Sequence, residues 1–221
     1  PFIVQTTVGA HNLGEIEKIA AFAHAELAAS VWNLYFLVPT GRGVFISDIS
    51  PDQYDSVLAE LAAIQKSYAG KMLVSAKCAP HYVKTLFETD PASPFLKAYT
   101  GGAGGCPAGT HYLGIRPNGD VTPCPYLPVF GGNLRDETLA DVWANSEPFV
   151  AIRRRAELGG RCGACELSAL CGGCRARAYG AKGDVMAEDP LCTHTPGRFA
   201  GSPVLAIPKP MLAMNYGCGS T

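Results

Sequence analysis

The chain has 221 residues, of which 48% are hydrophobic and 17% are charged. This length suits one domain of ordinary size or two small ones. Its 18 basic and 19 acidic side chains give a net charge of −1, which excludes a basic protein that binds nucleic acid or an acidic membrane surface. The most apolar stretch, residues 19–38, is interrupted by Glu26 and Asn33, and we therefore expect no membrane span.

Three short apolar runs in the first hundred residues predict strands, at residues 2–8, 31–38 and 72–76. A helix should follow the first run, with Asn12 as its cap and Glu15 completing a capping box. A second helix should begin after Ser50, because a proline and Gln53 follow at positions that favour a helix start. Strands and helices that alternate in this way indicate parallel βα units covered on one or both faces.

This α/β pattern leaves two architectures open. One is a small open sheet, and the other is the second half of a βα barrel whose first half is missing. In both, the ligand site lies at the C-terminal ends of the strands. Those ends carry Thr6 and Thr7, the turn at residues 39–43, and residues 75–78.

The run Gly-Gly-Ala-Gly-Gly at residues 101–105 predicts a flexible linker. It separates a first part, residues 1–100, from a cysteine-rich module, residues 106–199. The module should open with a β-hairpin around the Asn-Gly turn at residues 118–119, followed by one or two short helices. Residues 200–221 show no strong period and are expected to form a truncated tail.

Cysteine is the most informative residue type, because seven of the nine cysteines lie between residues 106 and 192. Seven thiolates need more than one metal centre. Secreted disulfide scaffolds lack the ordinary amphipathic segments that precede this module, so we expect a reduced, metal-loaded, cytoplasmic protein. The candidate metal ligands are Cys106, Cys124, Cys162, Cys165, Cys171, Cys174 and Cys192.

Other interpretations of this pattern stay open. Structural zinc bound by four cysteines suits C-x2-C pairs as well as iron–sulfur clusters do. A zinc-bearing interaction module, or a ferredoxin-like electron-transfer protein, would use the same residues without being an enzyme. Cys78 and Cys218 are expected to be an incidental buried residue and a tail thiol. His81, His111 and His194 are expected to be surface or structural residues, and the arginines around the module a solvated face.

At these residues the sequence resembles a known family. The order C-x12-G-x4-C, C-x2-C-x5-C-x2-C and a final cysteine is similar to the SPASM domain of radical S-adenosylmethionine (SAM) enzymes. The stretches at residues 121–128, 171–179 and 187–192 resemble the subgroup with haem-pathway enzymes that act on porphyrin propionates. The resemblance implies the C-terminal half of a (β/α)6 partial barrel, followed by a small cysteine-rich iron–sulfur domain with a β-hairpin and short helices.

The resemblance also implies two auxiliary 4Fe–4S clusters. It assigns one of them to Cys162, Cys165, Cys171 and Cys192, and the other to Cys106, Cys124 and Cys174. The family often has an eighth cysteine shortly before the position of Cys106, where this chain has glycine and alanine, so we expect the second cluster to keep an open iron. The two-residue spacing before Cys174, against three in the family, leaves a single-cluster arrangement open.

Radical SAM chemistry in the family needs a C-x3-C-x2-C loop, which residues 1–105 lack. The chain also begins with Pro1 rather than Met, and we expect it to be the C-terminal part of a longer enzyme, inactive by itself. An exposed strand edge would then make it poorly soluble. The candidate SAM contacts that remain are at strand ends, Asn12, Thr40, Gly41, Arg42 and Gly43.

The implied parent enzyme cleaves SAM reductively, abstracts a hydrogen atom from its substrate, and uses the auxiliary clusters to accept or deliver an electron. The first expected reaction is decarboxylation of a tetrapyrrole side chain. Modification of a peptide or protein is the alternative. A small electron donor such as ferredoxin or flavodoxin is the expected partner.

Overall fold

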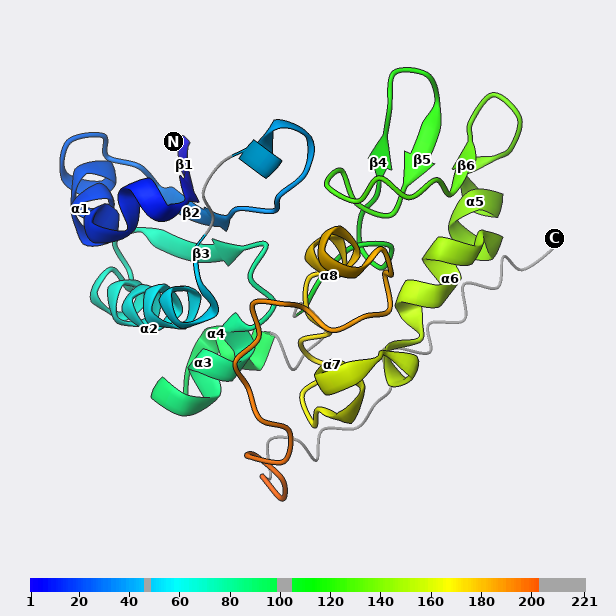
Figure 1. Ribbon diagram of the computed structural model, residues 1–221. Coiled ribbons are helices and arrows are strands. Elements are labelled where there is room, and N and C mark those ends of the chain that lie inside the picture. Colours follow the sequence, from blue (N-terminus) through cyan, green and yellow to red (C-terminus); the bar gives the residue numbers. More distant parts are fainter. Residues whose placement is uncertain (46–48, 99–104, 203–221) are drawn as a thin grey trace, which may run out of the picture.

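A computed structural model describes residues 1–45, 49–98 and 105–202 of the chain. Figure 1 shows a parallel sheet with its helices beside a cysteine-rich part built from shorter elements. The predicted linker lies outside the described residues except for Gly105, and so does the predicted tail from residue 203 onward. No helix among the described residues is long and apolar enough to cross a membrane.

The first sheet contains three parallel strands in the order β1-β2-β3. They are β1 (Ile3–Val8), β2 (Val31–Phe36) and β3 (Leu73–Lys77). Helices α1 (Ile16–Ala25) and α2 (Pro51–Ser67) connect them and lie on the same face of the sheet (Figure 1). The predicted strands and the βα order are confirmed.

The start of α2 follows the sequence prediction. The Ser50 hydroxyl accepts a hydrogen bond from the Gln53 amide at 3.2 Å, and the Gln53 side chain accepts one from the Ser50 amide at 2.8 Å. Each of these two bonds satisfies a backbone donor that lacks a partner within the helix.

The predicted cap of α1 is wrong, because a short 3-10 helix, Ala10–Glu15, precedes α1. The Asn12 side chain accepts a hydrogen bond from the Gly9 amide at 3.0 Å and donates one to the Thr7 carbonyl at 2.9 Å. These bonds tie the turn to the end of β1, and asparagine favours such side-chain contacts to nearby backbone over a helix.

The two faces of the sheet differ in polarity, because successive side chains in a strand point to opposite faces. The face toward the helices carries buried apolar side chains, Val8, Trp32, Leu34, Phe36 and Val74. The register places Gln5 beside Asn33, and Asn33 beside Ser75, on the other face. The helices therefore cover one face, and the other presents these polar side chains together with exposed Ile3 and Leu73 at the strand starts.

Two short helices, α3 (Tyr82–Thr89) and α4 (Pro94–Ala98), follow β3. A second, antiparallel sheet lies in the cysteine-rich part and contains β4 (Gly114–Ile115), β5 (Asp120–Thr122) and β6 (Gly132–Asn133). Its first two strands form the predicted hairpin. The third strand was not predicted, because two residues are too few to show a period.

The remaining helices of the described cysteine-rich part are short. They are α5 (Leu139–Asn145), α6 (Glu147–Arg153), α7 (Gly160–Ala164) and α8 (Arg175–Lys182). The first two, which precede Cys162, agree with the prediction of one or two short helices there, whereas the last two were not predicted. After α8 the chain returns to the first part (Figure 1), where the Phe199 ring lies 5.7 Å from the Phe87 ring on α3.

The hydrophobic core extends across the predicted linker. Leu167 and Leu191 belong to the same buried cluster as the apolar face of the sheet, and Val38 belongs to a buried cluster with cysteines of the second part. Gly105 is closely packed, because a Cβ atom there would lie 2.6 Å from the Leu170 carbonyl oxygen. At this residue glycine is required by close packing rather than by flexibility.

Candidate metal centres

Four cysteines line one cavity where α3 meets the cysteine-rich part. It encloses about 300 Å³ of space, some of it open to solvent. His81, Arg161 and Ser168 line it as well. The cysteines are Cys162, Cys165, Cys171 and Cys192, the set that the family resemblance assigns to one cluster.

We call these four cysteines the outer set and their cavity the outer cavity. Hydrogen-bond donors face the sulfur atoms of the outer set. The Leu167 amide lies 3.3 Å from the Cys165 Sγ, and the Gly173 amide lies 3.4 Å from the Cys171 Sγ. Arg175 adds a guanidinium nitrogen 3.8 Å from the Cys162 Sγ. Such donors stabilise the negative charge of metal-bound thiolates, and they tune an iron–sulfur cluster where one is bound.

Three thiols of the outer set, those of Cys165, Cys171 and Cys192, are protonated in the absence of a cation. Burial raises the pKa of Cys165 to about 11, and burial likewise raises the pKa of Cys171 and of Cys192. A thiolate is the form that binds metal, so binding at this cavity releases protons.

The second predicted set, which we call the second cysteine group, also lies together in one buried cluster. Its members are Cys106, Cys124 and Cys174. A hydrogen bond with Cys174 lowers the pKa of Cys106 to about 7. The Tyr112 hydroxyl and the Tyr126 amide lie 3.2 Å and 3.4 Å from the Cys124 Sγ. The structure therefore gathers the cysteines into the two groups that the resemblance implies.

The expectation of a solvated arginine face is wrong for three side chains, Arg155, Arg175 and Arg177, which are buried. Arg155 donates to the carbonyl oxygens of Ala169 and Cys106 at 2.9 Å and 2.7 Å. Arg175 donates to those of Val185 and Ala187 at 2.8 Å and 2.7 Å. Buried guanidinium groups need such acceptors, and here they hold the loops that carry the cysteines.

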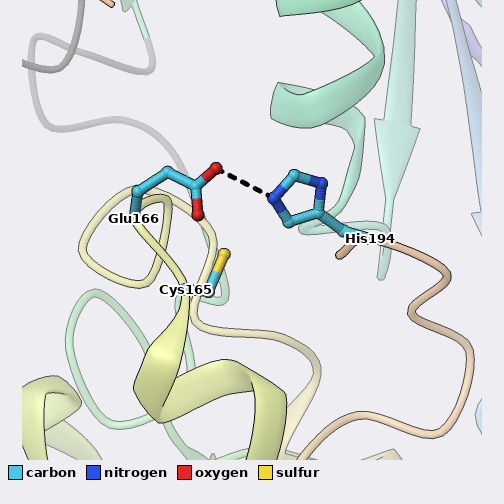
Figure 2. A group of neighbouring side chains, drawn as sticks. All are labelled: Cys165, Glu166 and His194. Atoms are coloured by element: carbon cyan, nitrogen blue, oxygen red, sulfur yellow. Dashed lines mark hydrogen bonds and ion pairs between the residues drawn. The ribbon is translucent and has the colours of Figure 1, made fainter. Parts of the chain in front are cut away.

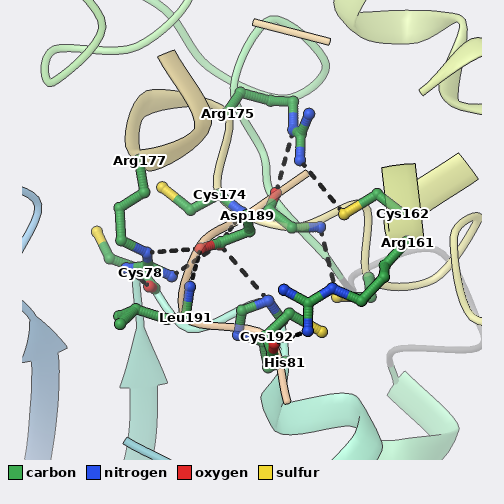
Figure 3. A network of polar contacts seen from close by, with 12 residues as sticks. Cys78, His81, Arg161, Cys162, Cys174, Arg175, Arg177, Asp189, Leu191 and Cys192 are labelled. Atoms are coloured by element: carbon green, nitrogen blue, oxygen red, sulfur yellow. Dashed lines mark hydrogen bonds and ion pairs between the residues drawn. The ribbon is translucent and has the colours of Figure 1, made fainter. Parts of the chain in front are cut away.

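Asp189 lies at the centre of the polar network that separates the two cysteine groups (Figure 3). It is fully buried, forms an ion pair with Arg177 at 3.1 Å, and accepts a hydrogen bond from the Cys174 amide at 2.6 Å. Burial raises the pKa of this carboxyl group, but Arg177 and the other contacts outweigh burial and lower it well below its usual range. Asp189 is therefore ionised.

His81 is buried and lines the outer cavity, so of the surface and structural roles expected for it, the surface role is excluded. Its Nε2 lies 3.5 Å from an Asp189 oxygen, and neither ring nitrogen has a hydrogen-bond partner. Burial lowers the pKa of His81 to about 4, which makes the ring neutral at physiological pH.

Among the residues that the structure describes, three possible ligand atoms lie within 4.8 Å of one another at Cys165, Glu166 and His194 (Figure 2). Glu166 is already engaged by His194 at 3.1 Å and by the Gly197 and Phe199 amides, both at 2.8 Å. The structural role expected for His194 agrees with these contacts. Through these contacts Glu166 connects the segment that follows α8 to the loop that carries the outer cysteines.

The spacing of the cysteines bears on which metal they suit. Thiolates around one zinc ion bond the same atom at about 2.3 Å, so their sulfurs lie about 3.8 Å apart. No three cysteine sulfurs in the described part of the chain come within 4.8 Å of one another. Thiolates of a 4Fe–4S cluster bind different irons and lie farther apart, so the outer set suits a cluster better.

The predicted SAM contacts lie where β1 and β2 end. Both polar groups of the Asn12 side chain are engaged by local backbone. The turn after β2 is closed by hydrogen bonds from the Thr40 amide to Val38 and from the Gly43 amide to Thr40. Gly41 has a positive φ of 55° and no atom near its Cβ position, and the Arg42 side chain lies outside the described residues. Their role stays a prediction.

Several residues of the site were not predicted from the sequence. Asp189 and Glu166 carry no distinctive spacing, and their roles arise from contacts between distant segments. Cys78 was set aside, yet it packs against the second cysteine group from the end of β3. Its position directly after an apolar strand is the signal that could have identified it.

Comparisons with known proteins agree with this geometry. Residues 106–166 match the SPASM family model, described as an iron-sulfur cluster-binding domain. The AdoMet-dependent heme synthase of Methanosarcina barkeri is 40% identical over 90% of this chain and 57% of its own length. The AdoMet-dependent heme synthase of Nitratidesulfovibrio vulgaris is 37% identical over 90% of this chain and 55% of its own length. A PqqA peptide cyclase of Xanthomonas euvesicatoria is 38% identical over 40% of this chain and 25% of its own.

The fold is similar to that in a crystal structure of Streptococcus suis SuiB bound to S-adenosylmethionine. The TM-score is 0.57 at 18% identity, over 87% of this chain and 45% of that one. The predicted fold class and the resemblance to radical SAM enzymes with a SPASM domain are confirmed. The chain spans about half the length of the curated heme synthases it matches.

Proposed function

We propose that this chain is the auxiliary-cluster portion of a radical SAM enzyme with a SPASM domain, and that it holds two 4Fe–4S clusters. The observation that carries the proposal is the cavity lined by Cys162, Cys165, Cys171 and Cys192. These cysteines come from separate segments, and the cavity gives them the common space that a cluster requires.

The two cysteine groups would each hold one cluster, which when bound accepts or delivers an electron. The chain itself would fix the positions of the thiolates and balance their negative charge. The amides of Leu167 and Gly173 face sulfur atoms of the outer set, and Arg175 places its positive charge beside Cys162. Burial in the second group limits the access of water to Cys106 and Cys174.

The substrate we propose is a tetrapyrrole whose side chain is decarboxylated. The support is the extent of the similarity, since heme synthases match 90% of the chain and the Xanthomonas peptide cyclase matches 40%. The polar strand face and the strand ends with Asn12 and residues 40–43 would face SAM and substrate. A ferredoxin or flavodoxin would supply electrons. A modified peptide remains the alternative substrate.

Metal analysis tests this proposal. We expect the anaerobically reconstituted chain to contain about eight irons and eight sulfides, with a brown colour and little zinc. Cys162→Ala and Cys106→Ala should each remove about half of the iron. Cys218→Ala, which changes a cysteine outside both sets, is the matched control and should retain all of it. A colourless chain that binds zinc without sulfide would contradict the proposal and favour a zinc-bearing interaction module.

A further inference from the structure

Cys78 occupies a distinctive place at the end of the parallel sheet. It follows β3 directly, at the C-terminal strand end where α/β proteins place their ligands. Its backbone has a φ of 54°, a left-handed conformation that is uncommon outside glycine. Such a conformation is strained and persists where surrounding contacts impose it.

Those contacts come from the cysteine-rich part. Arg177 on α8 donates a hydrogen bond from Nη1 to the Cys78 carbonyl oxygen at 2.9 Å, and Figure 3 shows Cys78 and Cys174 beside this arginine. The Cys78 side chain packs against the buried cluster that contains Cys106, Cys124 and Cys174. The arginine therefore fixes the backbone of Cys78 while its thiol faces the second cysteine group.

We propose that Cys78 is the fourth thiolate ligand of the second cluster, together with Cys106, Cys124 and Cys174. The inference rests on the two-cluster function proposed above. On binding, the Cys78 thiol loses its proton to solvent and its sulfur bonds to the remaining iron, with no change of oxidation state. The second cluster then has no open iron, and it joins the end of β3 to the cysteine-rich part.

Tyr112 is the competing candidate for this position, since its hydroxyl lies 3.2 Å from the Cys124 Sγ. That hydroxyl is already engaged as a hydrogen-bond partner of a ligand sulfur, and cysteine thiolates are the usual ligands of 4Fe–4S clusters. Tyr112→Phe is therefore expected to retain the iron.

The test compares Cys78→Ala, Cys78→Ser and Tyr112→Phe with the unaltered chain and with Cys218→Ala. We expect Cys78→Ala to lose up to about four irons or to show the electron paramagnetic resonance signal of a 3Fe–4S cluster. Cys78→Ser should retain an altered cluster signal, and Cys218→Ala should match the unaltered chain. The four irons of the outer cluster report in each variant that the fold is intact.

A full iron content with an unchanged resonance spectrum in Cys78→Ala would overturn the proposal, and so would iron loss in Tyr112→Phe alone. If Cys78→Ala does not fold, alkylation of the unaltered chain followed by mass spectrometry decides the question. Cys78 should be protected in the iron-loaded chain and react after chelation, whereas reaction at full iron content refutes its role. An unaltered chain without iron and sulfide would instead refute the two-cluster function.

Discussion

Asp189 is a single carboxylate on which several loops of the site depend. It pairs with Arg177, accepts hydrogen bonds from the amides of Cys174 and Leu191, and lies 3.5 Å from His81. A buried ion pair contributes little net stability, but removal of one partner leaves the other charge buried and unpaired. The pair therefore specifies one arrangement of the loops more than it stabilises the fold.

Asp189→Asn should lower the free energy of unfolding by about 3 to 5 kcal/mol, because Arg177 loses its buried counter-charge. Urea unfolding followed by circular dichroism measures this. The matched control is Glu157→Gln, which breaks an exposed ion pair with Arg154 at 3.0 Å. It should cost no more than about 1 kcal/mol. Equal losses in the two variants would show that burial of the Asp189 pair has no energetic consequence.

The loop between Cys171 and α8 is the element that brings the two cysteine groups close together. Gly173 has a φ of 59°, and a Cβ atom there would lie 2.9 Å from the Asp189 Cβ and 3.3 Å from the Cys162 Sγ. The loop can pass between the two groups only because this residue has no side chain.

Gly173→Ala should lower the free energy of unfolding by about 2 to 5 kcal/mol, the combined cost of a left-handed alanine and of overpacking. It should also reduce the iron content. Gly183→Ala is the matched control, because Gly183 has a similar φ of 69° at the end of α8 and no atom within 4 Å of its Cβ position. That variant should cost about 1 to 2 kcal/mol and retain the iron. Comparable iron loss in both variants would contradict the packing argument.

Local signals allowed prediction of several elements, whereas the division of the cysteines into two sets was implied by the family resemblance. Apolar runs identified β1 to β3, and the Ser50 and Gln53 pair identified the start of α2, since both signals lie within a few residues. The buried roles of Asp189 and Arg177, and the contact of Cys78 with the second cysteine group, were not predictable. The contact of Arg177 with Cys78 joins residues 99 positions apart and its contact with Asp189 joins residues 12 positions apart, and no periodicity records such contacts.

At the scale of the whole molecule, the unpaired edge of β1 is a potential site of self-association. Among the described residues β1 pairs with β2 on one side only, and Ile3 is 55% exposed. An exposed apolar edge strand is a template for pairing with a second chain. The sequence expectation of poor solubility rests on this edge.

Ile3→Lys should therefore reduce self-association of the chain, because a charge on an edge strand opposes edge-to-edge pairing. Sedimentation velocity at several concentrations measures this. Phe22→Lys is the matched control, since Phe22 is 54% exposed but lies on α1. We expect a clearly larger effect for Ile3→Lys. Equal effects would assign the association to general surface hydrophobicity.

The contacts of α8 have a consequence for motion. Parts of a chain that meet across a polar interface normally rotate against each other within microseconds to milliseconds. Arg177 prevents a simple hinge here, because it binds the Cys78 carbonyl on one side and Asp189 on the other. Rotation would break the hydrogen bond from Arg177 to the Cys78 carbonyl, whereas the ion pair with Asp189 lies within the cysteine-rich part. We therefore expect the sheet and the cysteine-rich part to move together, which would keep the strand ends at a constant distance from the two cysteine groups.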